Sequence, residues 1–89
     1  MTKTFHLEIV TATQHFFNDD VEMVIVNTVS GSEGFMANHV YATKLLTAGK
    51  IKIKMPGDKK LRLAEIKEGY IDVKEDILIF TDRIVWTEI

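Results

Sequence analysis

The chain of 89 residues contains no cysteine and only three histidines. Without a thiol it cannot form a disulfide, a thiolate zinc site, a cysteine-ligated iron–sulfur cluster or a thiol nucleophile. No two of the histidines stand at a spacing that would aim both rings at one ion from a single element. The sequence therefore predicts neither a metal site nor a bound cofactor.

The chain also lacks an excess of charge of one sign and any long apolar run. Lysine and arginine total 11 and aspartate and glutamate total 13, which gives a formal net charge of -2. Such a balance gives no general attraction to nucleic acid or to an anionic membrane. No segment approaches the roughly 18 apolar residues of a spanning helix, and the first residues lack the apolar core of a secretory signal. We expect any membrane association to run through a partner rather than through direct insertion.

Groups suited to catalysis are scarce as well. The serines are Ser30 and Ser32, and neither lies in a Gly-x-Ser-x-Gly pattern. The adjacent carboxylates Asp19-Asp20 and Glu75-Asp76 fall in turn-like sequence and would point to opposite faces of a strand. The sequence predicts no catalytic residue. A small hydrolase is a distant alternative, because it would need several titratable groups to converge in a pocket.

Each histidine has an ordinary structural interpretation. His6 lies on the polar row of an alternating segment, so we expect a solvated ring. His15 precedes Phe16 and Phe17, and we expect it to pack beside them. His39 follows a loop and a turn, and we expect its ring to bond the local backbone.

Clusters of turn-forming residues divide the chain into short segments. The clusters are Asn18-Asp19-Asp20, Ser30-Gly31-Ser32-Glu33-Gly34, Ala48-Gly49, Pro56-Gly57-Asp58, Glu68-Gly69 and Glu75-Asp76. Short alternating segments at turn spacings of about 8–12 residues are typical of a β-sandwich or a barrel. We predict an all-β, antiparallel β-sandwich that forms a single domain over residues 1–89.

Several segments allow sharper predictions. Residues 50–55 and 60–63 predict one hairpin, and residues 70–74 and 77–80 predict another. In residues 21–26 one row is fully apolar, with Val21, Met23 and Ile25, and the opposite row is mixed, so we expect both faces to be covered. The segment from Asn38 to Leu46 fits either a short helix or a strand, and we interpret it as a strand.

The first hairpin concentrates positive charge. We expect a dry row of Ile51, Ile53, Leu61 and Leu63, and opposite it a cationic stripe of Lys50, Lys52, Lys54, Lys60 and Arg62. Like charges across a hairpin are unfavourable unless something neutralises them, which suggests nucleic acid. No aromatic residue alternates with the lysines to stack on bases. A solubilising, edge-protecting face is therefore the preferred interpretation, and a nucleic-acid binder is the weakest alternative.

The last residues are unusually apolar. Ile84, Val85, Trp86 and Ile89 stand where a free tail would normally be polar. Such a tail should dock, either on its own sandwich or on a partner, since large aromatic side chains are enriched in interface cores. We treat Ile84, Trp86 and Ile89 as a candidate partner-docking tail.

Read together, several segments have a familiar order. They are Phe5-His6-Leu7-Glu8-Ile9-Val10-Thr11, residues 16–26, Gly31 to Gly34, Asn38-His39, Leu46-Thr47-Ala48-Gly49-Lys50-Ile51-Lys52-Ile53, Gly69-Tyr70-Ile71-Asp72-Val73 and Ile77-Leu78-Ile79-Phe80-Thr81-Asp82. In this order they resemble the epsilon subunit of F-type rotary ATP synthases over nearly the whole chain.

Several departures from the family pattern are visible. The family's His-Ala-Pro reads His39-Val40-Tyr41 here, and its Gly-Gly before the aromatic residue reads Glu68-Gly69. The loop acid is displaced to Glu33. Family members usually continue into a helical hairpin that can restrain the catalytic head and, in some, bind ATP. Because the given sequence stops at Ile89, we expect a sandwich-only member that neither binds nucleotide nor inhibits itself.

The resemblance implies a ten-stranded sandwich at the foot of a rotor, a non-catalytic central-stalk subunit that couples rotation of the gamma subunit to the membrane c-ring for ion-driven ATP synthesis. It implies a c-ring contact at Ser30, Gly31, Ser32 and Glu33 and a gamma contact at His39, Val40 and Tyr41. The protein would sit peripherally at the cytoplasmic face of the membrane. The alternative is a stand-alone β-sandwich that binds some unrelated protein, since one fold hosts many functions.

Overall fold

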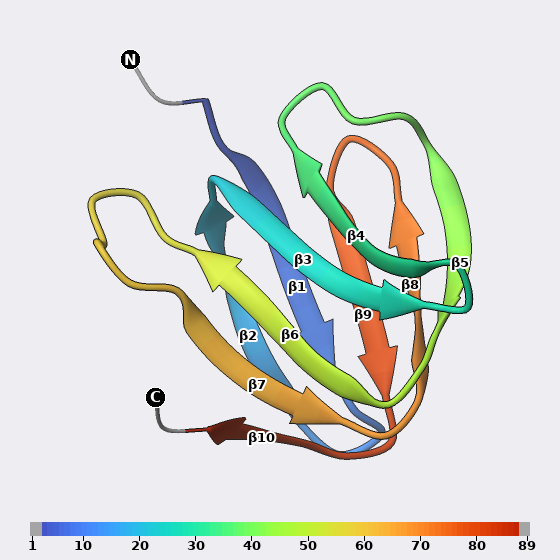
Figure 1. Cartoon of the computed structure of the whole chain (residues 1–89). Helices are drawn as coiled ribbons and strands as arrows, with labels where there is room; N and C mark the ends of the chain where they lie inside the picture. The colour runs from blue at the N-terminus through green and yellow to red at the C-terminus, as the bar shows by residue number, and fades with distance from the viewer. Residues whose placement is uncertain (1–2, 88–89) are drawn as a thin grey trace.

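The computed structural model describes residues 3–87, and within them ten β-strands. One group of five forms the front layer in Figure 1: β3 (Met23–Thr28), β4 (Gly31–Met36), β6 (Gly49–Lys54), β7 (Arg62–Ile66) and β10 (Ile84–Thr87). The second group lies behind it: β1 (Phe5–Val10), β2 (His15–Val21), β5 (Ala42–Leu46), β8 (Gly69–Val73) and β9 (Ile77–Thr81).

The two layers belong to one continuous sheet that folds over on itself. The front layer has the order β4-β3-β6-β7-β10 and the rear layer the order β5-β8-β9-β1-β2. They join at a corner where Thr28 of β3 pairs with Leu46 of β5. The strand pairs are antiparallel except that β1 and β9 run parallel, which is feasible because most of the chain separates them. The predicted antiparallel β-sandwich is confirmed, with this one parallel pair inside it.

The core consists of the inward rows of both layers. Alternation places Leu7 and Ile9 of β1 between the layers, next to Ile77 and Ile79 of β9. Ile51 and Ile53 of β6 face them from the other layer and are equally buried. Burying one such side chain stabilises the fold by about 1.5–3 kcal/mol relative to leaving it in water.

Both faces of residues 21–26 were expected to be covered, and in β3 the row of Val24 and Val26 is buried more deeply than the fully apolar row. Val24 and Val26 are fully buried, whereas Met23 and Ile25 are only half-buried on the outer side. The chain bends at Glu22 as it passes from β2 to β3, and the Glu22 amide bonds the Lys54 carbonyl (2.8 Å). The bend restarts the alternation, so Val21 belongs to one buried row and Val24 to another.

The prediction of which row is buried was wrong for the second strand of the first hairpin. Its second strand, β7, buries Ala64 and Ile66, while Leu61 and Leu63 stay half-exposed. Leu63 pairs with Lys52 and therefore shares the outer face with it. The connection between β6 and β7 is longer than a two-residue turn, so it does not fix which row of the second strand faces inward.

This register also divides the predicted cationic stripe. Lys50 and Lys52 are exposed on the outer face, but Arg62 pairs with Ile53 and so lies on the inward row at the end of the strand. The Lys54 ammonium bonds the carbonyls of Met55 (3.1 Å) and Asp58. The five cations therefore do not form one continuous face.

The segment Asn38 to Leu46 is a strand only in its second half. β5 begins at Ala42, and Asn38 adopts a φ of +69° in the turn that follows β4. Asparagine tolerates this left-handed conformation better than most residues. The hairpin of residues 70–74 and 77–80 is confirmed, because β8 and β9 pair from Gly69 to Val73.

Candidate interaction sites at the two ends of the sandwich

The hairpin between β3 and β4 forms one end of the sandwich. Thr28 pairs with Gly31 across a two-residue tip, Val29 and Ser30. Gly31 has a φ of +108°, a conformation that side chains with a Cβ rarely adopt. Val29 is 84% exposed, and Ser30, Gly31 and Ser32 are exposed as well. The tip therefore presents small, uncharged groups to solvent.

Glu33 differs from the other three residues predicted to contact the c-ring. Its carboxylate accepts hydrogen bonds from the Thr28 hydroxyl and from the Lys44 ammonium of β5. The Lys44 bond, followed by the Thr28 bond, holds the pKa of the Glu33 carboxyl below its usual value. This Thr28–Glu33–Lys44 brace ties the hairpin to the neighbouring layer, so the Glu33 charge is already paired within the chain.

His39 occupies the opposite end, after β4. Its ring nitrogens face two carbonyl oxygens, with Nδ1 2.7 Å from that of Met36 and Nε2 beside that of Lys74, and a neutral ring donates to one of them. The ring also packs edge-on against Phe5, with centroids 5.2 Å apart. The expected contact with the local backbone is confirmed, and the second contact reaches the β8–β9 turn. His39 thus connects the end of β4 to the β8–β9 turn and supports this end of the fold.

The two residues after His39 are placed differently. Val40 is 83% and Tyr41 is 59% exposed, and both precede β5 in an irregular stretch. Within the predicted gamma contact, Val40 and Tyr41 therefore face solvent, while His39 supports the loop that carries them.

One strand links the two ends. β4 begins at Gly31, beside the hairpin tip, and ends at Met36, just before the loop of Val40 and Tyr41. In Figure 1 this strand runs along the front layer between the β3–β4 turn and the loop that leads to β5. Six extended residues span about 20 Å, so the two exposed sets are separated by most of the molecule and cannot share one small ligand.

The tail docks on its own sandwich as far as residue 87. Ile84 is buried and pairs with Ile66. Trp86 is 46% exposed, and its ring lies 4.6 Å from that of Phe16 and 6.1 Å from that of Phe17. These contacts join β10 to β2 and close one open side of the sandwich. Ile89 lies outside the described residues, and a partner contact of Trp86 stays a prediction.

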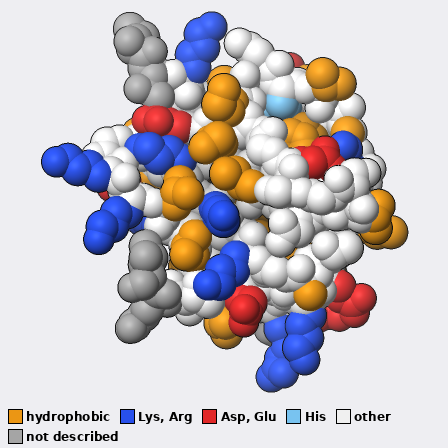
Figure 2. All heavy atoms as spheres, in the orientation of Figure 1, with side chains coloured by type: hydrophobic (Ala, Val, Ile, Leu, Met, Phe, Trp, Pro, Cys, Tyr) orange, Lys and Arg blue, Asp and Glu red, His pale blue; other side chains and the backbone are white. Residues whose placement is uncertain are grey.

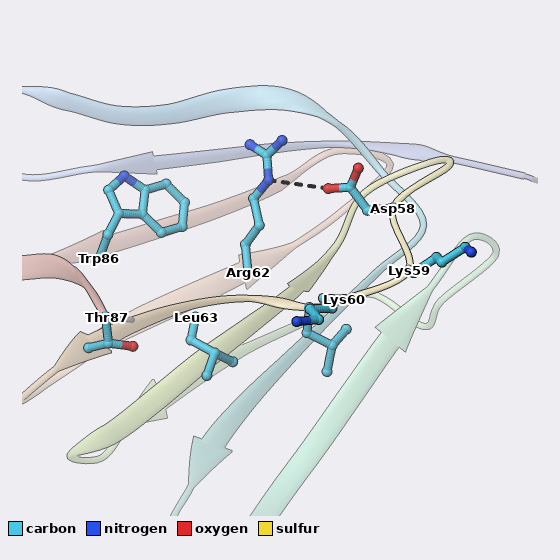
Figure 3. A pocket seen from close by; sticks show the side chains of 8 residues that line it. Asp58, Lys59, Lys60, Arg62, Leu63, Trp86 and Thr87 are labelled. Atoms are coloured by element: carbon cyan, nitrogen blue, oxygen red, sulfur yellow. Dashed lines mark ion pairs between the residues drawn. The ribbon is translucent and has the colours of Figure 1, made fainter. Parts of the chain in front are cut away.

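A pocket of about 700 Å³ lies beside Trp86 (Figure 3). Trp86 and Arg62 point to the same side of the β7–β10 pair, and Leu63 points to the other. Arg62 Nε is 3.4 Å from the Asp58 carboxylate. Arg62 is therefore paired within the chain, while Lys59 and Lys60 also line the pocket.

The front layer has a mixed outer surface. Figure 2 shows lysine and arginine side chains scattered among hydrophobic ones on this face. A groove of about 580 Å³ there is lined by Met23, Met36 and Leu61 together with Lys54 and Lys59. Alternating apolar and basic groups differ from the continuous basic track with stacking aromatics that binds single-stranded nucleic acid.

Sequence reasoning missed an apolar row on the outer face of the rear layer. Leu45 of β5, Tyr70 of β8, Phe80 of β9 and Val10 of β1 are cross-strand neighbours. The rings of Tyr70 and Phe80 stack with centroids 5.6 Å apart, and Leu45 and Tyr70 are exposed. Contiguous exposed apolar side chains mark interaction sites. The sequence does contain an indication of this row. In residues 77–81 the buried positions alternate with Leu78 and Phe80, which are apolar although they lie on the outer face.

Two other histidines bond carboxylates. His6 Nδ1 lies 3.0 Å from Asp20, and its Nε2 bonds Asn18. The Asp20 bond raises the pKa of His6 above its usual value. His15 does not pack beside the phenylalanines as predicted: it is exposed and lies 3.2 Å from Glu8, because residue 15 begins β2 where the register with β1 shifts.

Larger clusters do not form in the described part of the chain. Among residues 3–87, no three histidine, aspartate or glutamate side chains converge as metal ligands would. Within the same range, no helix has the length and hydropathy needed to cross a membrane.

Comparison with known proteins agrees with this geometry. The family model described as the β-sandwich domain of the ATP synthase delta/epsilon chain matches residues 4–87. The chain is 40% identical over 89 residues to the ATP synthase epsilon chain of Alkaliphilus oremlandii and 42% identical over 89 residues to that of Alkaliphilus metalliredigens. Each alignment covers 99% of this chain and 65% of the relative, so the chain spans about two thirds of their length.

A solved structure shows the same fold. The match lies in the mitochondrial ATP synthase of Euglena gracilis, a structure of its OSCP, F1 and c-ring, with a TM-score of 0.87 and 21% sequence identity. It covers 93% of this chain and 53% of the matched one. At this identity the likeness concerns the arrangement of strands alone.

Proposed function

The chain belongs to the family of the ATP synthase delta/epsilon-chain β-sandwich, and on that basis we propose that it serves as a central-stalk (rotor) subunit of an F-type ATP synthase. In this role it couples rotation of the gamma subunit to the membrane c-ring during ion-driven ATP synthesis. It sits at the cytoplasmic face of the membrane and associates with the membrane through the complex.

One observation carries this proposal: two exposed, separate surfaces lie at opposite ends of one folded sheet. The hairpin tip at Val29 and the loop at Tyr41 are joined by the single strand β4. A hydrogen-bonded sandwich with a close-packed core deforms little, so it holds such surfaces in a fixed relative orientation. Transmission of torque requires this property, whereas catalysis does not.

The hairpin end is assigned to the c-ring. Ser30, Gly31 and Ser32 are the contact residues, with Val29 at the tip. Glu33 supports them from behind, because its carboxylate is bonded to Lys44 and Thr28. A tip without a free charge suits a contact that is buried, because burying an unpaired charge is costly.

The opposite end and the rear layer are assigned to the gamma subunit. Val40 and Tyr41 project from the loop that His39 supports. The apolar row of exposed Leu45 and Tyr70 and half-buried Phe80 and Val10 lies on the rear layer. That layer begins with β5, the strand that follows this loop. A stable attachment should bury roughly 1,200 Å² or more in total, and an apolar row of this kind supplies area that three loop residues alone do not.

We further propose that the chain is not itself catalytic. The histidines serve internal contacts: the His39 ring lies against two carbonyl oxygens, His6 contacts Asp20 and Asn18, and His15 contacts Glu8. Both serines stand on an open hairpin rather than beside a base. These uses of the side chains favour a mechanical role.

The test is native mass spectrometry of the complex that contains this chain, purified from membranes of its own cell. We expect one copy together with the gamma and c subunits. Recovery of the chain with a soluble, unrelated protein, and never with those subunits, would support the stand-alone binding module instead.

A further inference from the structure

β4 is an edge strand with an open side. Within residues 3–87 it pairs only with β3, and no backbone–backbone hydrogen bond described outside the ladders involves it. At the Met36 end of its open side, the Met36 carbonyl is in contact with His39 Nδ1. A two-residue hairpin is closed by a hydrogen-bonded pair, here Thr28 and Gly31. Hydrogen-bonded and non-bonded pairs then alternate. The amides of Gly31, Glu33 and Phe35 therefore point to β3, and those of Ser32, Gly34 and Met36 point away from it.

The free edges of the sheet are not protected equally. β5, at the edge of the rear layer, contains Lys44 and continues into the front layer through the pairing of Leu46 with Thr28. β2 exposes Asn18, Asp19 and Asp20, and charged side chains deter other strands from pairing. β10 is only four residues long, and Trp86 packs across its side of the sandwich.

β4 has none of these protections. It is six residues long, contains no proline or lysine, and includes Gly34 and Ser32 on its exposed row. Its one charged side chain, Glu33, is paired with Lys44. An exposed, uncharged strand edge is a template for another strand.

From this contrast, and resting on the proposed function, we propose that the open edge of β4 receives an extended strand of the gamma subunit. The edge runs between the tip assigned to the c-ring and the loop assigned to gamma, so a partner bound at Val40 and Tyr41 continues along it. Backbone hydrogen bonds from Ser32, Gly34 and Met36 then fix the angle between the two subunits.

The side chains beside the edge indicate the chemistry of the added strand. Met36 is 60% exposed and lies next to half-buried Met23 on the outer face. The Glu33–Lys44 pair leaves no net charge on the inner side. The added segment is therefore uncharged, with an apolar residue that contacts Met36 and small or polar residues opposite Gly34 and Ser32.

Amide hydrogen exchange on the chain bound to the gamma subunit of its own synthase tests the proposal directly. We expect the amides of Ser32, Gly34 and Met36 to exchange at least about tenfold more slowly in the complex, since each gains a hydrogen-bonded partner. The amides of Glu33 and Phe35 are bonded already and serve as internal controls. A complex that forms without slowing the first set overturns the inference and leaves the proposed function intact.

A matched pair of variants provides the second test. Gly34 has an ordinary negative φ, and a Cβ placed on it lies 3.6 Å from Ile25 Cγ1, an ordinary contact. Gly34→Pro removes the outward amide, while Gly34→Ala retains it. We expect Pro to weaken gamma binding by about tenfold or more and Ala to change it by less than about twofold.

The remaining outcomes each decide the matter. If both variants and the parent chain bind gamma equally well, the proposal is wrong. If the parent chain binds no gamma at all, both this proposal and the proposed function are wrong. If Gly34→Pro melts before it can be assayed, exchange on the parent complex decides alone. A further outcome is that the free chain self-associates and slows the exchange of the same amides. In that case the edge of β4 pairs with a second copy of this chain, and the assignment to gamma is wrong.

Discussion

Glu33 shows how one side chain can connect two elements and thereby lose its availability to a partner. Its carboxylate bonds Thr28 on β3 and Lys44 on β5. These bonds hold its pKa below the reference value of 4.5. The ionised carboxylate therefore stabilises the hairpin, and this stabilisation is lost when the carboxyl is protonated.

The Glu33 brace predicts a loss of stability in acid. The pKa of Glu33 is lower in the folded than in the unfolded chain, so its contribution is present above about pH 4.5 and is lost as pH falls through the folded pKa. We expect Glu33→Gln to lower the melting temperature at neutral pH by about 2–4 °C and to match the parent in strong acid. A difference that persists in acid would contradict the brace. Ser32→Ala, at the neighbouring position on the exposed row of β4, is the control.

His6 predicts the opposite dependence. Its pKa is raised above 6.5 by Asp20, so its contribution is fully present below pH 6.5 and is lost as pH rises through the folded pKa. The melting temperature of Asp20→Asn should fall below that of the parent at about pH 5.5 and approach it at about pH 8.5. Asp82→Asn serves as the control, since Asp82 is exposed and takes part in none of the described ion pairs of residues 3–87. The same deficit for Asp20→Asn at both pH values would show that the ion pair is not responsible.

At the scale of elements, β10 shows how alternation divides an apolar segment between core and surface. Ile84 is buried, whereas its neighbour Val85 is 58% exposed and pairs with Glu65 on the outer face. The strand thus belongs to the sandwich through one row only.

Truncating the two rows of β10 should have unequal effects. Ile84→Ala leaves a cavity between the layers and should cost about 2–4 kcal/mol of unfolding free energy. Val85→Ala should change it by less than about 0.5 kcal/mol. Chemical denaturation measures both. Comparable losses for the two variants would mean that β10 is not seated as described.

The hairpins show which parts of the strand pattern could be predicted. Residues 70–80 form the expected hairpin because a short turn keeps the two strands in phase. Residues 50–66 were expected to bury Leu61 and Leu63, but the longer connection let β7 bury Ala64 and Ile66 instead. Alternation identifies a strand, and a long loop leaves its inward row undetermined.

At the scale of the whole molecule, two separate surfaces predict two separable defects. Tyr41 and Val29 lie at opposite ends of the sandwich, and both are mostly exposed. Tyr41→Ala should weaken binding to gamma by about tenfold or more, as loss of an aromatic anchor does, and leave c-ring association and folding unchanged.

The complementary variant is Val29→Asp, which adds a charge at the tip. It should weaken association with the c-ring and leave gamma binding unchanged, as read from pull-downs with each partner and from melting temperature. If either variant keeps its fold and weakens binding to both partners equally, the assignment of one partner to each end is wrong.

Three features of the candidate sites came only from the folded chain. The contact of His39 with Lys74 joins residues 35 positions apart, and the Glu33–Lys44 pair crosses from one layer to the other. The row of Leu45, Tyr70, Phe80 and Val10 draws its members from four strands. No local pattern reports such neighbours.

The amino-acid sequence by itself determined the fold class, most strand positions, the family and the poverty of catalytic groups, because these depend on short-range alternation, turn chemistry and composition. Tertiary structure alone decided which row of β3 and β7 is buried, which carboxylate is paired, and which strand edge is left open. The physical reason is that these properties depend on pairing between distant strands, and a shift of one residue in that pairing exchanges the inner and outer rows.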